Sequence, residues 1–161
     1  MDSTLRTVAD AMTRKIVTVT ERDVLEKLEE GMQRLRFRHL PVVDDEGKLV
    51  GLLTHSDIRH AWSTPLSDRE QDRNAIIGQV PVGRVMQHEV VTVEPGDSLV
   101  EAGKLMWEAK MGCLPVVDDE GSLVGIITAA DFIRVALQLL GSDVAKVDVD
   151  DLARQARSMV A

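Results

Sequence analysis

The chain has 161 residues, 44% of them apolar and 29% charged, which suits one globular domain or two small ones. Its formal charge of −8 argues against binding to nucleic acid or to an anionic membrane, and an aromatic content of 2% argues against a single-strand binder built on stacked rings. Cys113 is the only cysteine, so no internal disulfide can form, as is typical of a reducing compartment. The sequence shows no zinc-spaced cysteine or histidine cluster, no apolar leader at its N-terminus and no apolar run long enough to span a bilayer. We therefore expect a cytoplasmic protein without a metal site.

A duplicated segment dominates the sequence. Residues 40–47 read LPVVDDEG, and residues 114–121 read the same. The same offset of 74 residues holds without a gap from Val8 to Ile58 and relates further pairs: Met12 and Met86, Asp23 and Asp97, Gly51 and Gly125, Thr54 and Thr128, and Asp57 and Asp131. Two copies of a long unit indicate an internal duplication rather than an open array of short repeats.

The first half of each copy predicts a strand and a helix. Residues 16–19 are a short β-branched run, which predicts a strand. Asp23 then predicts a helix N-cap, with Glu26 three residues later as its capping-box partner. Helical spacing predicts one buried face, made of Leu25, Leu28, Met32 and Leu35 in the first copy and of Leu99, Ala102, Met106 and Ala109 in the second.

The second half of each copy predicts a hairpin and another helix. Residues 40–43 and 49–53 predict two strands, joined by a turn in which Gly47 can adopt a positive φ. We interpret the acidic residues of this turn as a hairpin tip and not as a catalytic carboxylate pair. A second helix is expected to start near Thr54 or Ser56. The predicted unit is therefore strand, helix, strand, strand, helix, which is an α+β fold.

The predicted boundaries follow from the duplication. Residues 1–66 form the first copy, 67–81 a charged connector that ends at Pro81, and 82–141 the second copy, with Gly141 as a helix C-cap. The tail, residues 142–161, could form one more helix from about Asp150 that docks on the body or on a second subunit.

The two copies, each with Leu-Pro-Val-Val-Asp and Gly-x-x-Thr-x-x-Asp at constant spacing, resemble a tandem pair of cystathionine-β-synthase (CBS) domains, a Bateman module. The layout, with Arg38-His39-Leu40-Pro41 and Gly112-Cys113-Leu114-Pro115, is most similar to stand-alone bacterial pairs such as acetoin-utilisation regulators. The resemblance implies two βαββα repeats packed as a pseudo-two-fold pair. It also implies that AMP, ADP, ATP or S-adenosylmethionine binds in clefts between the repeats.

The resemblance implies that Asp57 and Asp131 accept hydrogen bonds from ribose hydroxyls, with Thr54 and Thr128 nearby. A carboxylate is chemically suited to this role, because it can accept two donors from a vicinal diol. The structural alternative is a capping box, in which the threonine is the helix N-cap and the aspartate occupies N3. Both roles can coexist at a helix start, where the helix dipole favours an anion.

The phosphate contacts implied by the resemblance fall on Arg38, His39 and His55. Arg34, Arg36 and Arg38 form a basic cluster in an acidic chain, which supports an anion site. The alternative is a solvated helix end, since cations are favoured at a helix C-terminus. The second copy departs from the pattern because Cys113 replaces His39, Ala129 replaces His55 and Lys110 is the nearest base, which puts two equivalent phosphate sites in doubt. Cys113 lacks a local histidine and is not expected to be a nucleophile.

The resemblance places the adenine beside the first strand and the Leu-Pro pair of each copy. In the first copy these residues are Val17, Thr18, Leu40 and Pro41, and in the second they are Val91, Thr92, Leu114 and Pro115. Their side chains also suit a hydrophobic core, so any contact with adenine is expected mainly from backbone groups.

The sequence therefore predicts a regulatory module and not an enzyme, because it shows no nucleophile–base pair and no metal set. We expect a homodimer that senses an adenosine-containing ligand and signals to an effector protein that the sequence does not identify. The alternative is a ligand-independent dimerisation or adaptor module, in which the Thr-x-x-Asp motifs are only helix caps.

Overall fold

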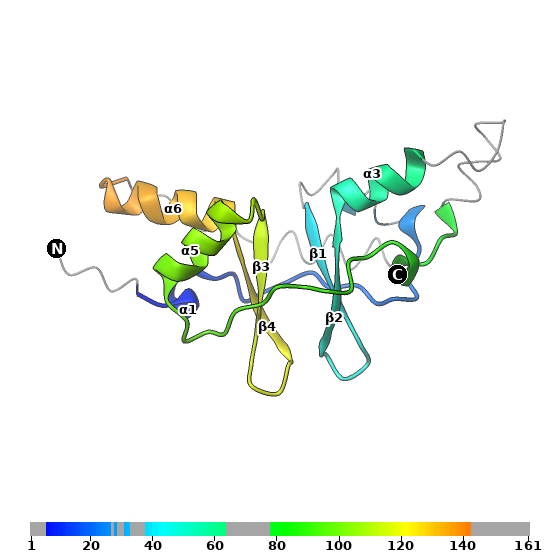
Figure 1. Cartoon of the computed structure of the whole chain (residues 1–161), viewed down its shortest axis with the longest axis horizontal. Coiled ribbons are helices and arrows are strands. Elements are labelled where there is room, and N and C mark those ends of the chain that lie inside the picture. Colours follow the sequence, from blue (N-terminus) through cyan, green and yellow to red (C-terminus); the bar gives the residue numbers. More distant parts are fainter. Residues whose placement is uncertain (1–5, 27, 29–30, 33–37, 64–77, 143–161) are drawn as a thin grey trace. The chain divides into compact units, whose positions relative to one another are not determined.

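The structure is a computed structural model that describes residues 6–26, 28, 31–32, 38–63 and 78–142 (Figure 1). The described residues form two compact units. Unit 1 draws on Met1–Ile16 and Val91–Asp150, and unit 2 on Val17–Val90. Each unit thus combines most of one sequence copy with the opening residues of the other. The boundaries at 66, 81 and 141 remain predictions, and the predicted tail helix lies outside the described residues.

Backbone hydrogen bonds tie each opening segment to the copy that it joins. In unit 1, the Val8 N–H donates to the Asp97 carbonyl over 2.9 Å, and in unit 2 the Val82 N–H donates to the Asp23 carbonyl over 2.8 Å. These two contacts are related by the same offset as the sequence repeat. The duplication therefore produces the same exchange of segments in both units.

Unit 1 contains one antiparallel hairpin with helices beside it (Figure 1). Its elements are α1 (Val8–Ala11), α5 (Leu99–Glu108), β3 (Cys113–Val117), β4 (Leu123–Thr128) and α6 (Ala129–Leu139). In the register of the hairpin, Cys113 lies opposite Thr128. The end of β4 runs directly into α6, so the threonine that closes the strand also caps the helix.

Unit 2 repeats this hairpin with different surroundings. Its elements are β1 (His39–Val43), β2 (Leu49–Thr54), α3 (His55–Ser63) and the 3-10 turn η1 (Val82–Arg84), and the described residues 25, 26, 28, 31 and 32 are helical. His39 lies opposite Thr54, as Cys113 lies opposite Thr128. Gly47 and Gly121, at the two hairpin tips, have φ values of 82° and 83°, as the predicted turns require.

The strand predicted at 16–19 is reduced to a single parallel bridge between Val19 and Val42. The Val19 N–H donates to the Pro41 carbonyl over 3.1 Å, and the Val43 N–H donates to the Val19 carbonyl over 2.9 Å. Extending this ladder to Val17 would need an N–H from Pro41, which proline lacks. Pro115 limits the second copy in the same way, leaving one bridge between Val93 and Val116.

The predicted cap at Asp23 is wrong by one residue. The Asp23 carboxylate instead accepts from the Thr20 N–H over 2.7 Å and closes the turn before the helix. In the second copy the N-cap is Ser98, which accepts from the Glu101 N–H over 3.4 Å. The spacing of apolar residues could not reveal this shift, because both the aspartate and the residue after it precede the buried helix face.

Each unit has its own hydrophobic core, and the predicted helix faces supply much of it. Leu25, Leu28 and Met32 are buried in unit 2, as are Leu99, Ala102 and Met106 in unit 1. Ala109 was predicted on this face but is exposed, because α5 ends at Glu108. Leu35 lies outside the described residues.

Two other observations bear on function. No helix within the described ranges is long and apolar enough to cross a membrane. The same ranges contain no group of three or more His, Cys, Asp or Glu side chains that could hold a metal ion.

Candidate functional site

The candidate site in unit 2 is built where β2 ends and α3 begins. The Asp57 Oδ2 atom accepts from the Thr54 N–H over 2.8 Å and from the Thr54 hydroxyl over 2.6 Å. The Asp57 N–H donates back to Thr54 Oγ1 over 3.2 Å. These contacts are those of a capping box, so the structural alternative is realised. They occupy mainly one carboxylate oxygen, which leaves the other for further contacts.

Unit 1 has the same capping box. The Asp131 Oδ2 atom accepts from the Thr128 N–H over 2.9 Å and from the Thr128 hydroxyl over 2.8 Å. The Asp131 N–H lies 3.4 Å from Thr128 Oγ1. The local geometry of the motif therefore does not distinguish the two copies, and any difference must come from the second carboxylate oxygen.

In unit 2 the further partner of the carboxylate is a neutral amide. The Gln87 Nε2 atom lies 3.3 Å from each oxygen of Asp57. Gln87 reaches this place because its backbone pairs with Leu52 of β2, donating to the Leu52 carbonyl over 2.9 Å and accepting over 3.0 Å. Gln87 is exposed and Asp57 is partly exposed. No local sequence pattern predicts this contact, because it joins residues 30 positions apart.

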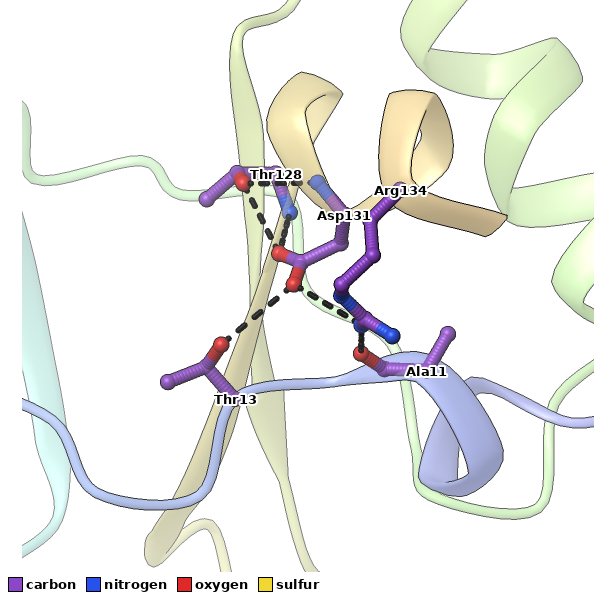
Figure 2. A network of polar contacts seen from close by, with 5 residues as sticks. All are labelled: Ala11, Thr13, Thr128, Asp131 and Arg134. Atoms are coloured by element: carbon purple, nitrogen blue, oxygen red, sulfur yellow. Dashed lines mark hydrogen bonds and ion pairs between the residues drawn. The ribbon is translucent and has the colours of Figure 1, made fainter. Parts of the chain in front are cut away.

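In unit 1 the second oxygen is held by an arginine and a threonine. Asp131 Oδ1 accepts from Arg134 Nη2 over 3.2 Å and from the Thr13 hydroxyl over 3.3 Å. Both contacts are drawn in Figure 2. The same Arg134 Nη2 donates to the Ala11 carbonyl over 2.6 Å. Asp131 is only 7% exposed and is the one buried charged residue among those described.

The pairing of β1 with β2 brings the basic residues predicted to contact phosphate to the end of the hairpin that holds Thr54, the partner of Asp57. Arg38 is exposed, and its carbonyl accepts from the His55 N–H over 3.0 Å. Burial lowers the pKa of His39 below its ordinary value of 6.5, the Arg38 charge lowers it further, and the Asp57 charge opposes both. His39 is therefore neutral at pH 7 and offers a phosphate a hydrogen bond rather than a charge. Arg34 and Arg36 lie outside the described residues.

The second copy has different chemistry at the position of His39. Cys113 is 2% exposed, and burial raises the pKa of its thiol to about 12. The thiol is therefore protonated at neutral pH, so it neither attracts a phosphate nor acts as a nucleophile.

The residues predicted to contact adenine divide into core and exposed groups. The side chains of Leu40, Pro41, Leu114 and Pro115 are buried, as the structural alternative expects. Thr18 and Thr92 are exposed, Val17 is partly buried and Val91 is 44% exposed. The Pro41 and Pro115 carbonyls already accept from Val19 and Val93. The backbone at 17–18 and 91–92 is therefore the part of this set with the most freedom to meet a ligand.

Comparison with known proteins identifies the family. The family model for the CBS domain matches residues 8–64 and again residues 82–138. The chain belongs to the CBS domain family. This confirms the resemblance, and the α+β fold with two CBS repeats, each holding a short antiparallel sheet and helices, is that of a CBS pair.

Three solved structures are similar to this CBS pair. The acetoin utilisation protein AcuB from Vibrio cholerae has a TM-score of 0.72 and 35% identity, covering 84% of this chain and 93% of that chain. CBSX2 from Arabidopsis thaliana, crystallised with AMP, has a TM-score of 0.71 and 29% identity, covering 83% of this chain and 98% of that chain. The CBS pair of protein MJ0100, in complex with 5′-methylthioadenosine and S-adenosylmethionine, has a TM-score of 0.67 and 25% identity, covering 81% and 98%.

Proposed function

We propose that this CBS pair is a regulatory module that binds an adenosine-containing ligand and passes the resulting change to another protein. Support comes from two similar structures: CBSX2 was crystallised with AMP, and the CBS pair of protein MJ0100 with 5′-methylthioadenosine and S-adenosylmethionine. These three ligands share an adenosine with a ribose. No catalytic step is proposed.

One observation carries the proposal: Asp57 is a partly exposed carboxylate that is already oriented by Thr54. Its further contact among the described residues is with the exposed amide of Gln87, whose Nε2 atom lies 3.3 Å from each carboxylate oxygen. A ribose diol can replace this amide at little cost. A diol donates two hydrogen bonds to a carboxylate, and hydrogen bonds to an ionised acceptor are the stronger kind. The position at the start of α3 adds a favourable interaction between the carboxylate and the helix dipole.

The basic residues of unit 2 favour a phosphate-bearing ligand. Arg38 is exposed and directly precedes β1, whose first residue, His39, lies opposite Thr54. His55 follows Thr54 as the first residue of α3. An arginine pairs strongly with a phosphate, and the histidine rings can add hydrogen bonds. S-adenosylmethionine has no phosphate, so we place AMP, ADP and ATP ahead of it.

The exposed apolar residues support a homodimer. All the large exposed hydrophobic residues among those described lie in unit 1, chiefly on α5 and α6: Val91, Val100, Leu105, Trp107, Ile133, Leu137, Leu139 and Leu140. The two helices are neighbours, since the Phe132 ring packs against Gly103. Such a concentration of apolar side chains typically marks an interaction surface. The same surface also favours the second candidate function, a dimerisation or adaptor module that binds no ligand.

Isothermal titration with AMP, ADP, ATP and S-adenosylmethionine tests the sensor against the adaptor. We expect saturable binding of at least one nucleotide to the nucleotide-free protein, weakened by about 100-fold or more in Asp57→Ala because the charge-assisted bonds are lost. Asp10→Ala is the matched control, because Asp10 forms the same kind of capping box with Thr7, with contacts of 2.7 and 2.9 Å. If none of the four ligands binds to folded protein, the adaptor is favoured. It predicts that Asp57→Ala lowers only the free energy of unfolding, by about 1 kcal/mol.

A further inference from the structure

The two Thr-x-x-Asp motifs of this chain are equal in sequence but unequal in their surroundings. Asp57 is partly exposed and meets an exposed amide, whereas Asp131 is 7% exposed and meets a guanidinium. The Arg134 side chain is itself only 12% exposed. A buried, paired carboxylate has a different role from a partly exposed one.

Two substitutions between the copies produce the difference. At the offset of 74 residues, Arg134 corresponds to His60, and Thr13 corresponds to Gln87. The backbones of Thr13 and Ile126 of β4 form two hydrogen bonds of 2.9 Å, one in each direction, and these bonds position Thr13 beside Asp131. Neither position lies inside the shared motif, so the motif alone predicts two equivalent sites.

Arg134 does more than neutralise Asp131. Its Nη2 atom also donates to the Ala11 carbonyl over 2.6 Å, at the C-terminal end of α1 (Figure 2). Carbonyls at a helix end lack partners inside the helix and need one from elsewhere. Arg134 therefore ties the opening segment of the chain to the start of α6, and Asp131 holds the guanidinium in place for this contact.

A ribose diol would have to compete with these contacts for Asp131 Oδ1. Displacing Arg134 would leave its largely buried guanidinium without a carboxylate partner. An unpaired buried charge is one of the more costly changes in a folded protein. At Asp57 the competing group is an exposed neutral amide that water can solvate instead. The cost of binding a diol is therefore much higher at Asp131.

We propose that Asp131 is a structural anchor for Arg134 and that each chain binds a single adenosine ligand, through Asp57. The proposal rests on the proposed function for its ligand and narrows the two expected ribose sites to one. The claim that Asp131 anchors Arg134 concerns the folded protein without ligand, so it is tested separately.

Native mass spectrometry of the full chain at saturating AMP or ATP counts the ligands per chain. One ligand per chain in the wild type and none in folded Asp57→Ala is the expected result. Two ligands per chain, or one that persists in folded Asp57→Ala, would overturn the single site while leaving the proposed function standing. No ligand at any concentration would instead overturn the proposed function and, with it, the single site.

Thermal unfolding without ligand tests the anchor. Arg134→Leu should lower the melting temperature by about 10 °C, because it leaves Asp131 buried and unpaired. Arg22→Leu is the matched control, since Arg22 and Asp45 form an ion pair at 3.1 Å that is 83% and 77% exposed, and it should change the melting temperature by less than about 2 °C. Asp131→Ala and Asp57→Ala both lose a capping box, so the larger drop in Asp131→Ala isolates the buried contacts. Equal drops in these two variants, or an Arg134→Leu effect no larger than that of Arg22→Leu, would contradict the anchor.

Discussion

The two hairpins of this CBS pair share their strands and capping boxes but differ in what lies beside them. β1–β2 places His39 opposite Thr54, and β3–β4 places Cys113 opposite Thr128. His39 is polar and is affected by the Asp57 charge, while Cys113 is buried and protonated. The duplicated motif therefore preserves local structure, whereas ligand chemistry depends on residues outside the motif.

Equivalent core positions offer the strongest test of the structural similarity. Leu53 and Ile127 are related by the repeat offset, and both are 0% exposed. Leu53→Ala and Ile127→Ala should each lower the free energy of unfolding by about 3 kcal/mol, because each leaves a cavity in its own core. Urea denaturation measures both. A difference of more than about 2 kcal/mol between them would show that the two cores are not equivalent in strength.

The exposed surfaces of the two units should differ in their effect on dimerisation. Ile133 of α6 is 61% exposed, and its counterpart in α3 is the exposed Arg59. If α5 and α6 form the dimer interface, Ile133→Glu should weaken dimerisation by about 10-fold or more, because it buries a charge among apolar side chains. Arg59→Glu is the matched control and should leave dimerisation unchanged. Analytical ultracentrifugation across a dilution series measures both, and a dimer unaffected by Ile133→Glu would place the interface elsewhere.

The two units should also contribute differently to the pH dependence of stability, because unit 2 has His39 where unit 1 has Cys113. We expect this effect to be the smallest of the three. Because burial and the Arg38 charge lower the pKa of His39 below 6.5, the unfolded chain takes up a proton at a higher pH than the folded chain does. The contribution of His39 to the free energy of unfolding is therefore constant above about pH 7 and falls as the pH is lowered through 6.5. His39→Gln should reduce this loss between pH 7.5 and 5.5, because the variant has no imidazole to take up a proton. Identical pH profiles for the variant and the wild type would contradict the assignment.

The parts of the structure that the sequence predicted well are the local ones. The hairpins follow from two apolar runs on either side of an Asp-Asp-Glu-Gly turn, and the capping boxes from two residues three apart. The partners in each of these interactions lie no farther apart than His39 and Thr54, which are 15 residues apart, so the sequence pattern contains both partners.

The parts that the sequence did not predict depend on distant partners. Predicting that the first strand is short would require knowing that Val17 lies beside Pro41, which has no N–H to donate. The Arg134 contact with Ala11 spans 123 residues, and the Thr13 contact with Asp131 spans 118. These contacts exist because the opening segments are exchanged between the copies, and no local pattern marks that exchange.

The measurement that most directly tests the central claim is a calorimetric titration of the nucleotide-free wild type with AMP and ATP, repeated on Asp57→Ala and Asp10→Ala. We predict one binding event per chain in the wild type and in Asp10→Ala, and a loss of about 100-fold or more in affinity in Asp57→Ala. Wild-type affinity in a folded Asp57→Ala variant would contradict the claim that this carboxylate binds the ribose.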